Sequence, residues 1–122
     1  MISISLCAHF DAAHQLDLPY ESPCNRAHGH RYEVEVVASA EALEHGMVID
    51  YNVLKSAIDE FDHRDLNAMP EFKGGALATT AENIALVLAQ MLQARAGSRV
   101  SIDEVTVRET PQTAARWRKM SG

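Results

Sequence analysis

The segment CNRAHGH, residues 24–30, places one cysteine and two histidines within seven positions of the chain. In an extended segment alternate side chains share a face, so His28 and His30 point the same way, with Cα atoms roughly 6.6 Å apart. Two imidazoles placed in this way can bind one metal ion. The spacing therefore predicts a metal site that includes His28 and His30.

A metal site of this kind needs a third ligand, and His14 in FDAAHQL is the candidate. Three histidines leave a tetrahedral zinc ion with one open position, as in catalytic zinc sites. The spacing leaves two interpretations of Cys24 open. As a ligand it would close a structural zinc site in a binding protein, and as a free thiol near the metal it could act as a base or nucleophile.

Two further motifs carry groups suited to proton transfer or ligand binding. Asp62 precedes His63 in FDHRDLN, where the first predicted helix ends. An Asp–His pair can hold the imidazole in one tautomer for proton transfer, although a charged helix end explains the same two residues. Glu109 in VRET shares a strand face with Val105 and Val107, so we expect a buried carboxylate that needs partners.

The chain has 122 residues, of which 47% are apolar and 23% charged, and a formal net charge of -6. These values predict one domain over residues 1–122 with a hydrophobic core, and they argue against a nucleic-acid partner. No apolar run reaches the roughly 18–20 residues of a membrane helix, and the start MISISLCAHFD lacks a signal-peptide pattern. We therefore expect a cytoplasmic protein with no membrane partner, in which Cys7 and Cys24 form no disulfide and Cys7 is a small core residue.

Hydrophobic periodicity predicts the order ββααββ. Strands are expected over residues 2–10, 32–38, about 102–109 and 114–119. Helical spacing predicts one helix from the N-cap Asp50 to Phe61, and a second from the Thr-x-x-Glu capping box of Thr79–Glu82 to Gly97. This order indicates an α+β fold with two helices on one face of an antiparallel sheet, whose open edges should be covered or paired with other copies of the chain.

The chain resembles the family of 6-pyruvoyl-tetrahydropterin and 6-carboxy-tetrahydropterin synthases. The resemblance runs along nearly the whole chain and is carried by the motifs FDAAH, CNRAHGH, GMVIDYNVLK, FDHRDLN, TTAEN and VRET, in the family's order and spacing. It implies the tunnelling fold (T-fold) of ββααββ subunits. It also implies a homo-oligomeric ring, a tetramer or hexamer, with active sites between subunits.

Carried over residue by residue, the resemblance implies three zinc ligands: His14, His28 and His30. It implies a catalytic group made of the thiol and its proton-relay partners: Cys24, Asp62 and His63. Glu109 would anchor the pterin ring, whose N2/N3 edge offers two donors that one carboxylate can accept. Thr80 would line the same pocket, beside Ala81, where the family usually has a hydroxylated residue.

The three-residue gap between Cys24 and His28 resembles the bacterial 6-carboxy branch of the family. That branch implies a carbon–carbon lyase that converts 7,8-dihydroneopterin triphosphate to 6-carboxy-5,6,7,8-tetrahydropterin, acetaldehyde and triphosphate, an early step toward queuosine. The GMVID stretch looks closer to the pyruvoyl branch, and Gln15 replaces an arginine common in the bacterial branch. The alternatives are therefore a 6-pyruvoyl-tetrahydropterin synthase, which eliminates triphosphate and keeps the side-chain carbons, and a non-enzymatic zinc- or pterin-binding protein.

Overall fold

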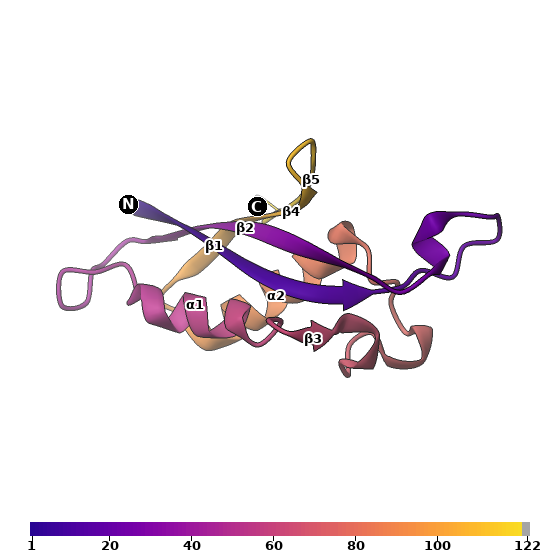
Figure 1. The fold of residues 1–122 in the computed structure, drawn as a ribbon. Helices are drawn as coiled ribbons and strands as arrows, with labels where there is room; N and C mark the ends of the chain where they lie inside the picture. The colour runs from indigo at the N-terminus through magenta and orange to yellow at the C-terminus, as the bar shows by residue number, and fades with distance from the viewer. Residues whose placement is uncertain (121–122) are drawn as a thin grey trace.

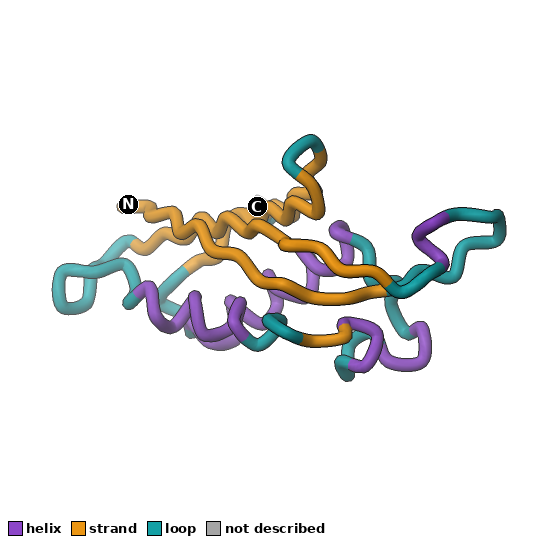
Figure 2. Tube along the Cα trace, viewed as in Figure 1, coloured by secondary structure: helices purple, strands orange, loops and turns teal. Residues whose placement is uncertain are grey.

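The computed structural model describes residues 1–120; residues 121–122, the end of the predicted domain, lie outside the described residues. The elements follow one another as β1 (Ile2–His14), β2 (His28–Ala40), α1 (Tyr51–Asp59), β3 (Arg64–Asp65), α2 (Ala81–Ala96), β4 (Ser101–Thr110) and β5 (Thr113–Arg118) (Figure 1). Short 3₁₀ helices cover Pro23–Asn25, Leu66–Ala68 and Lys73–Gly75. Figure 2 shows that the loop joining β1 to β2 projects beyond the end of the sheet.

The strands form one five-stranded sheet in the order β3-β1-β2-β4-β5. Within residues 1–120 all neighbouring strands are antiparallel except the pair of β1 with the two-residue β3. Both helices lie on the same side of the sheet (Figure 1). The predicted α+β architecture is confirmed, and β3 is an addition, because two residues are too short to show an alternating pattern.

The first strand is longer than the sequence predicts. Alternation predicts its end at Phe10, but β1 stays in register with β2 from the pair Ile2 and Ala40 to the pair His14 and His28. The extra residues continue the strand because each finds a partner on β2, a long-range pairing that local periodicity does not report. This extension carries His14 to the end of the sheet.

The helix boundaries depend on their capping residues. Asp50 caps α1 as predicted, since its Oδ1 atom accepts a hydrogen bond from the backbone N–H of Asn52 at 2.9 Å. The helix ends at Asp59, two residues before the predicted end at Phe61. Thr80 caps α2 through Oγ1 and the N–H of Asn83, so the expectation that the capping box begins at Thr79 is wrong.

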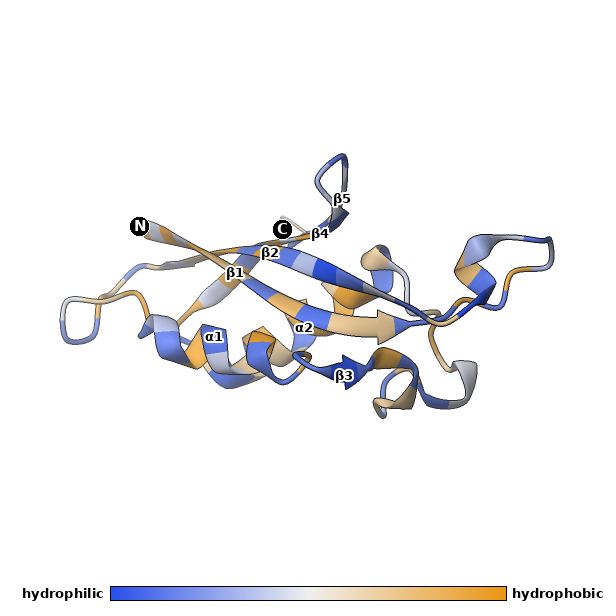
Figure 3. Ribbon diagram, viewed as in Figure 1, coloured by the Kyte–Doolittle hydropathy of each residue, from blue (hydrophilic) through white to orange (hydrophobic). Residues whose placement is uncertain are grey.

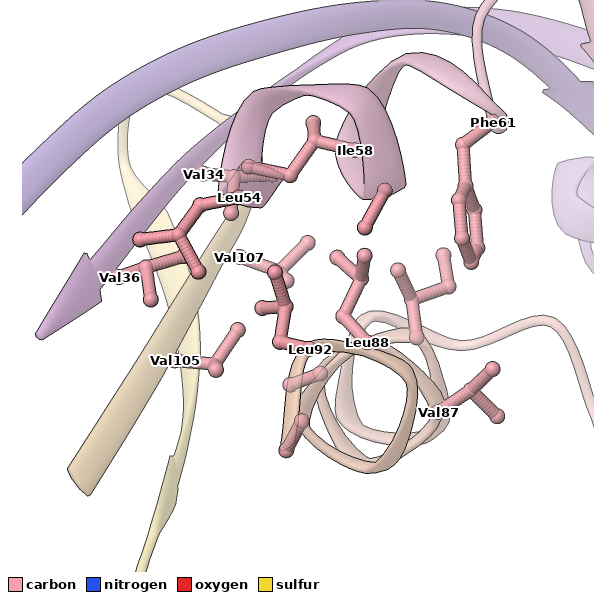
Figure 4. Packing of buried hydrophobic residues seen from close by; sticks show 14 of the residues in the cluster. Val34, Val36, Leu54, Ile58, Phe61, Val87, Leu88, Leu92, Val105 and Val107 are labelled. Carbon is pink, nitrogen blue, oxygen red and sulfur yellow. The ribbon is translucent and has the colours of Figure 1, made fainter. Parts of the chain in front are cut away.

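The hydrophobic core fills the space between the sheet and the two helices. Figure 4 shows side chains from the sheet facing side chains from α1 and α2. All of them are buried: Val34, Val36, Val105 and Val107 from the sheet, Leu54 and Ile58 from α1, and Leu88 and Leu92 from α2. The apolar periodicity of the strands and helices therefore predicts which side chains form the core. This core supports the sheet and with it the ends of β1, β2 and β4.

The other face of the sheet points away from the helices. Cys7 lies on that face of β1 and is exposed, so the prediction that it is a core residue is wrong. Its neighbours Leu6 and Ala8 pack against the core instead, because successive strand residues point to opposite faces. Figure 3 shows hydrophilic and hydrophobic residues along the same strands. None of the helices within residues 1–120 has the length and hydrophobicity needed to cross a membrane.

Candidate metal centre

The pairing of β1 with β2 brings the three predicted histidine ligands together. His14, the last residue of β1, lies opposite His28, the first residue of β2. His30 follows two positions later on the same face of β2. The ring centroid of His28 is 4.4 Å from that of His14 and 4.9 Å from that of His30. The face-sharing predicted from the H-x-H spacing is therefore confirmed.

Strand β4 adds a carboxylate to these imidazoles. The register of β4 on β2 places Arg108 opposite Glu33, so Glu109 follows at the level of the histidines. Its Oε1 atom lies 2.8 Å from Nε2 of His30 and 3.4 Å from Nε2 of His14. One potential ligand atom from each of four residues lies within 4.8 Å of the others: His14, His28, His30 and Glu109. The sequence predicts that Glu109 needs partners but not that these partners are the histidines.

Backbone carbonyl groups fix which nitrogen of two rings carries a proton. The Nδ1 atom of His14 lies 2.7 Å from the carbonyl oxygen of Thr79, and that of His28 lies 2.7 Å from the carbonyl oxygen of Arg26. A carbonyl oxygen only accepts, so each Nδ1 is the donor and each neutral ring presents a lone pair at Nε2. The Nε2 atoms of metal-binding histidines are oriented in the same way in many proteins.

The innermost imidazole is nearly inaccessible to solvent. The His14 side chain is 1% exposed, and burial lowers the pKa of His14, so the ring is held neutral near pH 7. Its Nε2 atom has no hydrogen-bond donor among the described residues, although a carboxylate oxygen faces it. The Nε2 atom of His14 and the Oε1 atom of Glu109 are both acceptors and lie 3.4 Å apart, an arrangement that favours a cation bound between them. The donor set, three imidazole nitrogens and one carboxylate oxygen, therefore fits a divalent metal ion.

Cys24 lies outside this group of four residues. It is half-buried in the short helix Pro23–Asn25 of the loop between β1 and β2, and its carbonyl oxygen accepts a hydrogen bond from the N–H of Leu16. The other thiol, Cys7, is on the far face of the sheet, where desolvation and the neighbouring Glu35 carboxylate raise its pKa. Of the two thiols, Cys24 is the one on the loop that joins His14 to His28. Its position outside the group of potential ligand atoms favours a free thiol over a fourth ligand.

Asp62 and His63 lie in the turn after α1, against the edge of β1. The Oδ1 atom of Asp62 accepts a hydrogen bond from the N–H of Asp11 at 2.8 Å, and the N–H of His63 donates to the Asp11 carbonyl at 2.7 Å. The first of these bonds lowers the pKa of Asp62. The His63 ring is 83% exposed, with Nε2 3.5 Å from Oδ2 of Asp62. The pair is therefore tied to β1 and presents its imidazole to solvent.

His63 adopts a backbone conformation that non-glycine residues rarely use. Its φ angle is 56°, in the left-handed region. Such conformations persist only where the surrounding structure imposes them, and they are frequent at functional sites. Here the two hydrogen bonds to Asp11 hold the turn in place. A hollow of about 610 Å³ lies beside it and is lined by both His30 and His63.

The carboxylate of Glu109 also borders a second hollow. This hollow has a volume of about 550 Å³ and lies between the start of α2 and β5, with Ala81, Glu82, Leu86 and Trp117 in its wall. Thr80, the predicted pocket residue, precedes Ala81 as the N-cap of α2 and is half-buried. Glu109 thus stands between the imidazoles and a pocket with aromatic and aliphatic side chains.

The fold and this cluster together define an α+β protein with a candidate metal site at the end of its sheet. The model of the family described as 6-pyruvoyl tetrahydropterin synthase matches residues 3–120 of the chain. The chain belongs to this family, so the resemblance inferred from the motifs is confirmed.

Relatives in several organisms agree with this assignment. The 6-carboxy-5,6,7,8-tetrahydropterin synthase of Bacillus subtilis is 30% identical over 122 residues, which cover 93% of this chain and 83% of that protein. The enzyme of the same name from Synechocystis is 32% identical over 115 residues, covering 88% and 86%. A relative from Pyrococcus abyssi is 51% identical over 55 residues, but the match spans only 35% of that protein's length and 45% of this chain. The expectation that the chain is an enzyme agrees with these names.

Solved structures share the fold. The structure of Caenorhabditis elegans 6-pyruvoyl tetrahydropterin synthase matches with a TM-score of 0.79 at 27% identity, covering 98% of this chain and 96% of that chain. The Plasmodium vivax 6-pyruvoyl tetrahydropterin synthase matches with a TM-score of 0.68 at 18% identity, covering 98% and 99%, which shows the fold alone. The predicted fold class is confirmed by these matches.

Proposed function

We propose that the protein is a zinc-dependent lyase that converts 7,8-dihydroneopterin triphosphate to 6-carboxy-5,6,7,8-tetrahydropterin, acetaldehyde and triphosphate. The observation that carries the proposal is the convergence of three imidazoles and one carboxylate at the end of the sheet. The names of the Bacillus and Synechocystis relatives support the 6-carboxy product. The proposal includes a cytoplasmic location and a place early in queuosine biosynthesis.

In this proposal His14, His28 and His30 hold the zinc ion. Zinc supplies, when bound, a Lewis acid for the side-chain hydroxyl groups of the substrate. The carbonyl oxygens of Thr79 and Arg26 hold two of the rings with Nε2 toward the site, which prepares the ligands before the metal arrives. Burial of His14 excludes water from one side of the site.

The proton transfers are assigned to residues outside the metal ligands. Cys24 removes a proton from a side-chain carbon of the substrate. His63, oriented by Asp62, transfers the next proton, and its exposed ring beside a hollow shared with His30 suits that role. Arg31 lines the same hollow and offers a positive charge, although its Nε also lies 3.3 Å from Oδ1 of Asp11.

The pterin ring is proposed to bind in the hollow between α2 and β5. Glu109 accepts two hydrogen bonds from the N2/N3 edge of the ring. Trp117 and Leu86 provide apolar surface for the ring, and Thr80 lies at the helix start on the same side. Ala81 has no hydroxyl, so the contact that a hydroxylated residue would make there is either missing or made by the backbone of this turn.

We propose that other copies of the chain complete the active site in a tetramer or hexamer. Within residues 1–120, β3 pairs with β1 only at Ala12 and Ala13, and β5 pairs only with β4, which leaves strand edges for intersubunit pairing. In such an oligomer Cys24 of one copy could meet Asp62 and His63 of another, and sedimentation velocity would reveal the oligomer.

The pyruvoyl-forming reaction is the second candidate, supported by the fold similarity to the C. elegans enzyme. Incubation of the zinc-loaded protein with 7,8-dihydroneopterin triphosphate, followed by chromatography and mass spectrometry of the pterin, separates the two. A 6-carboxy pterin supports the proposal, and a 6-pyruvoyl pterin moves the protein to the other branch. No product, with zinc retained, would favour a binding protein.

A further inference from the structure

The carboxylate of Glu109 can reach two different partners, a metal ion bound by the histidines and a ring bound in the hollow between α2 and β5. Its Oε1 atom is within 3.4 Å of the Nε2 atoms of both His14 and His30, inside the proposed metal-binding group. The same side chain borders the hollow between α2 and β5 that is proposed to receive the pterin. It is 27% exposed, so it is accessible from that hollow.

The lone pairs of the histidines favour metal ligation by this carboxylate in the absence of substrate. Because His14 and His28 donate from Nδ1, their Nε2 atoms are acceptors, as is Oε1 of Glu109. These acceptor atoms lie within 4.8 Å of one another, and a cation bound among them would stabilise the group. Zinc accepts imidazole nitrogen and carboxylate oxygen, and four such ligands complete a closed site.

We propose that Glu109 is a switching ligand, which binds the metal through Oε1 in the resting protein and leaves it to bind the pterin. This inference rests on the proposed function for the identity of the second partner. A bidentate bond to the pterin edge needs both oxygens of the carboxylate aimed into the hollow between α2 and β5, whereas ligation needs Oε1 aimed at His14 and His30. In this proposal the side chain turns from the histidines to the ring, which takes Oε1 from the metal and opens the coordination position that a catalytic site requires.

The switch explains why the pterin anchor is so close to the metal ligands. Without substrate the site is four-coordinate and closed to other small ligands. When the ring binds, the open position becomes available to the substrate's own side chain, so that the ring must be seated before the metal can act. By linkage, a pterin that lacks this side chain should weaken metal binding, and the metal should weaken binding of that pterin by the same factor.

The test uses the whole chain loaded with Co²⁺ in place of zinc, because the visible absorption of Co²⁺ reports its coordination number. The variant is Glu109→Gln, which keeps the shape of the side chain and removes the anionic ligand. The control is Glu82→Gln, which neutralises another carboxylate in the wall of the same hollow but outside the metal-binding group. Zinc affinity is measured on the same three proteins by competition with a chelator.

We expect Glu109→Gln to change the Co²⁺ spectrum without any pterin and to weaken zinc binding by at least about 10–100-fold, the loss seen when even an indirect partner of a ligand is removed. Glu82→Gln should leave both unchanged. 7,8-Dihydropterin has no side chain at C6. Its addition should shift the wild-type Co²⁺ spectrum in the direction of the change caused by Glu109→Gln, and it should leave the spectrum of Glu109→Gln unchanged.

Identical spectra and zinc affinities for wild type and Glu109→Gln would overturn the ligand assignment. A spectrum of the wild type that does not change with saturating 7,8-dihydropterin would overturn the switch, and this arm needs no variant to fold. Both arms are read without turnover. A protein that shows the switch but forms no product would contradict the proposed lyase activity and not this inference.

Discussion

The Nδ1 atom of His14 lies 2.7 Å from the carbonyl oxygen of Thr79, a residue 65 positions further along the chain. This contact joins the end of β1 to the residue before the N-cap of α2. It also explains why α2 begins one residue later than its capping-box pattern predicts, since Thr79 is turned toward β1. The Oγ1 atom of Thr79 donates to the Gln15 carbonyl at 3.2 Å.

The first prediction concerns the metal ligands. His14→Ala removes a buried imidazole from the proposed site, so the purified protein should lose its bound metal. His9→Ala is the control, because His9 is an exposed histidine of the same strand that points to the opposite face of the sheet. Metal content per chain is measured after gel filtration. Equal metal content in the two variants would contradict the assignment of His14.

The second prediction concerns Asn67, which holds the chain just after His14. Its Oδ1 atom accepts from the Gln15 N–H at 2.8 Å, and its Nδ2 donates to the Gln15 carbonyl at 2.9 Å. Asn67→Ala should lower the free energy of unfolding by about 0.5–1.5 kcal/mol, because the Gln15 N–H loses its acceptor and the Gln15 carbonyl keeps only the Thr79 hydroxyl as a donor. Asn52→Ala is the control, because the exposed Asn52 side chain makes no hydrogen bond within residues 1–120. Urea unfolding ranks the variants, and a loss as large in Asn52→Ala as in Asn67→Ala would count against this explanation.

The third prediction separates the role of the His63 imidazole from that of its backbone. His63→Asn should fold normally, because asparagine tolerates the left-handed conformation of this residue. Loss of a general acid or base should lower kcat by about 10²–10⁴-fold. The matched control is His45→Asn, since His45 is exposed and also has a positive φ angle. A normal kcat in His63→Asn would remove His63 from the mechanism.

The fourth prediction is a pH dependence of stability that arises from Asp62. The Asp11 N–H lowers the pKa of Asp62 below its ordinary value of 3.8 in the folded state. The carboxylate therefore stabilises the folded protein above that value, and this contribution is lost as the pH falls through the lower folded pKa. Metal-free wild type should be more stable than Asp62→Asn at pH 7, with a difference that shrinks below about pH 4. Urea unfolding across this range tests it, and a constant difference would contradict it.

The fifth prediction tests the core that supports the site. Leu88 is fully buried between α2 and the sheet, so Leu88→Ala should cost about 2–5 kcal/mol of unfolding free energy. Leu86 lies on the same helix but is only half-buried, so Leu86→Ala should cost less. Denaturant unfolding of both variants gives the comparison. Similar losses would mean that the packing assigned to Leu88 is wrong.

Local patterns in the sequence were sufficient for the features that depend on near neighbours. The H-x-H spacing predicts that His28 and His30 share a face, and the sequence before the first helix predicts Asp50 as its cap; both agree with the structure. The contact between Glu109 and the histidines depends instead on the register of β4 against β2, which includes a shift between Val37 and Ala38. A register set by long-range pairing leaves no local pattern to read.

The same limit applies to the connection between β1 and the turn after α1. The FDHRDLN motif indicated proton-transfer groups, but their attachment to Asp11 is a contact across about 50 residues. The parallel pair of β1 and β3 and the two bonds from Asn67 to Gln15 are of the same kind. These contacts are set by the tertiary arrangement and correspond to no local pattern in the sequence.

The most direct test of the central proposal is the ratio of acetaldehyde to triphosphate released from 7,8-dihydroneopterin triphosphate by the zinc-loaded protein. The carbon-cleaving lyase should release one acetaldehyde for each triphosphate, and Cys24→Ala should release neither while it keeps its zinc. Triphosphate released without acetaldehyde would contradict the carbon–carbon lyase assignment. Loss of zinc from Cys24→Ala would contradict the assignment of Cys24 as a free catalytic thiol.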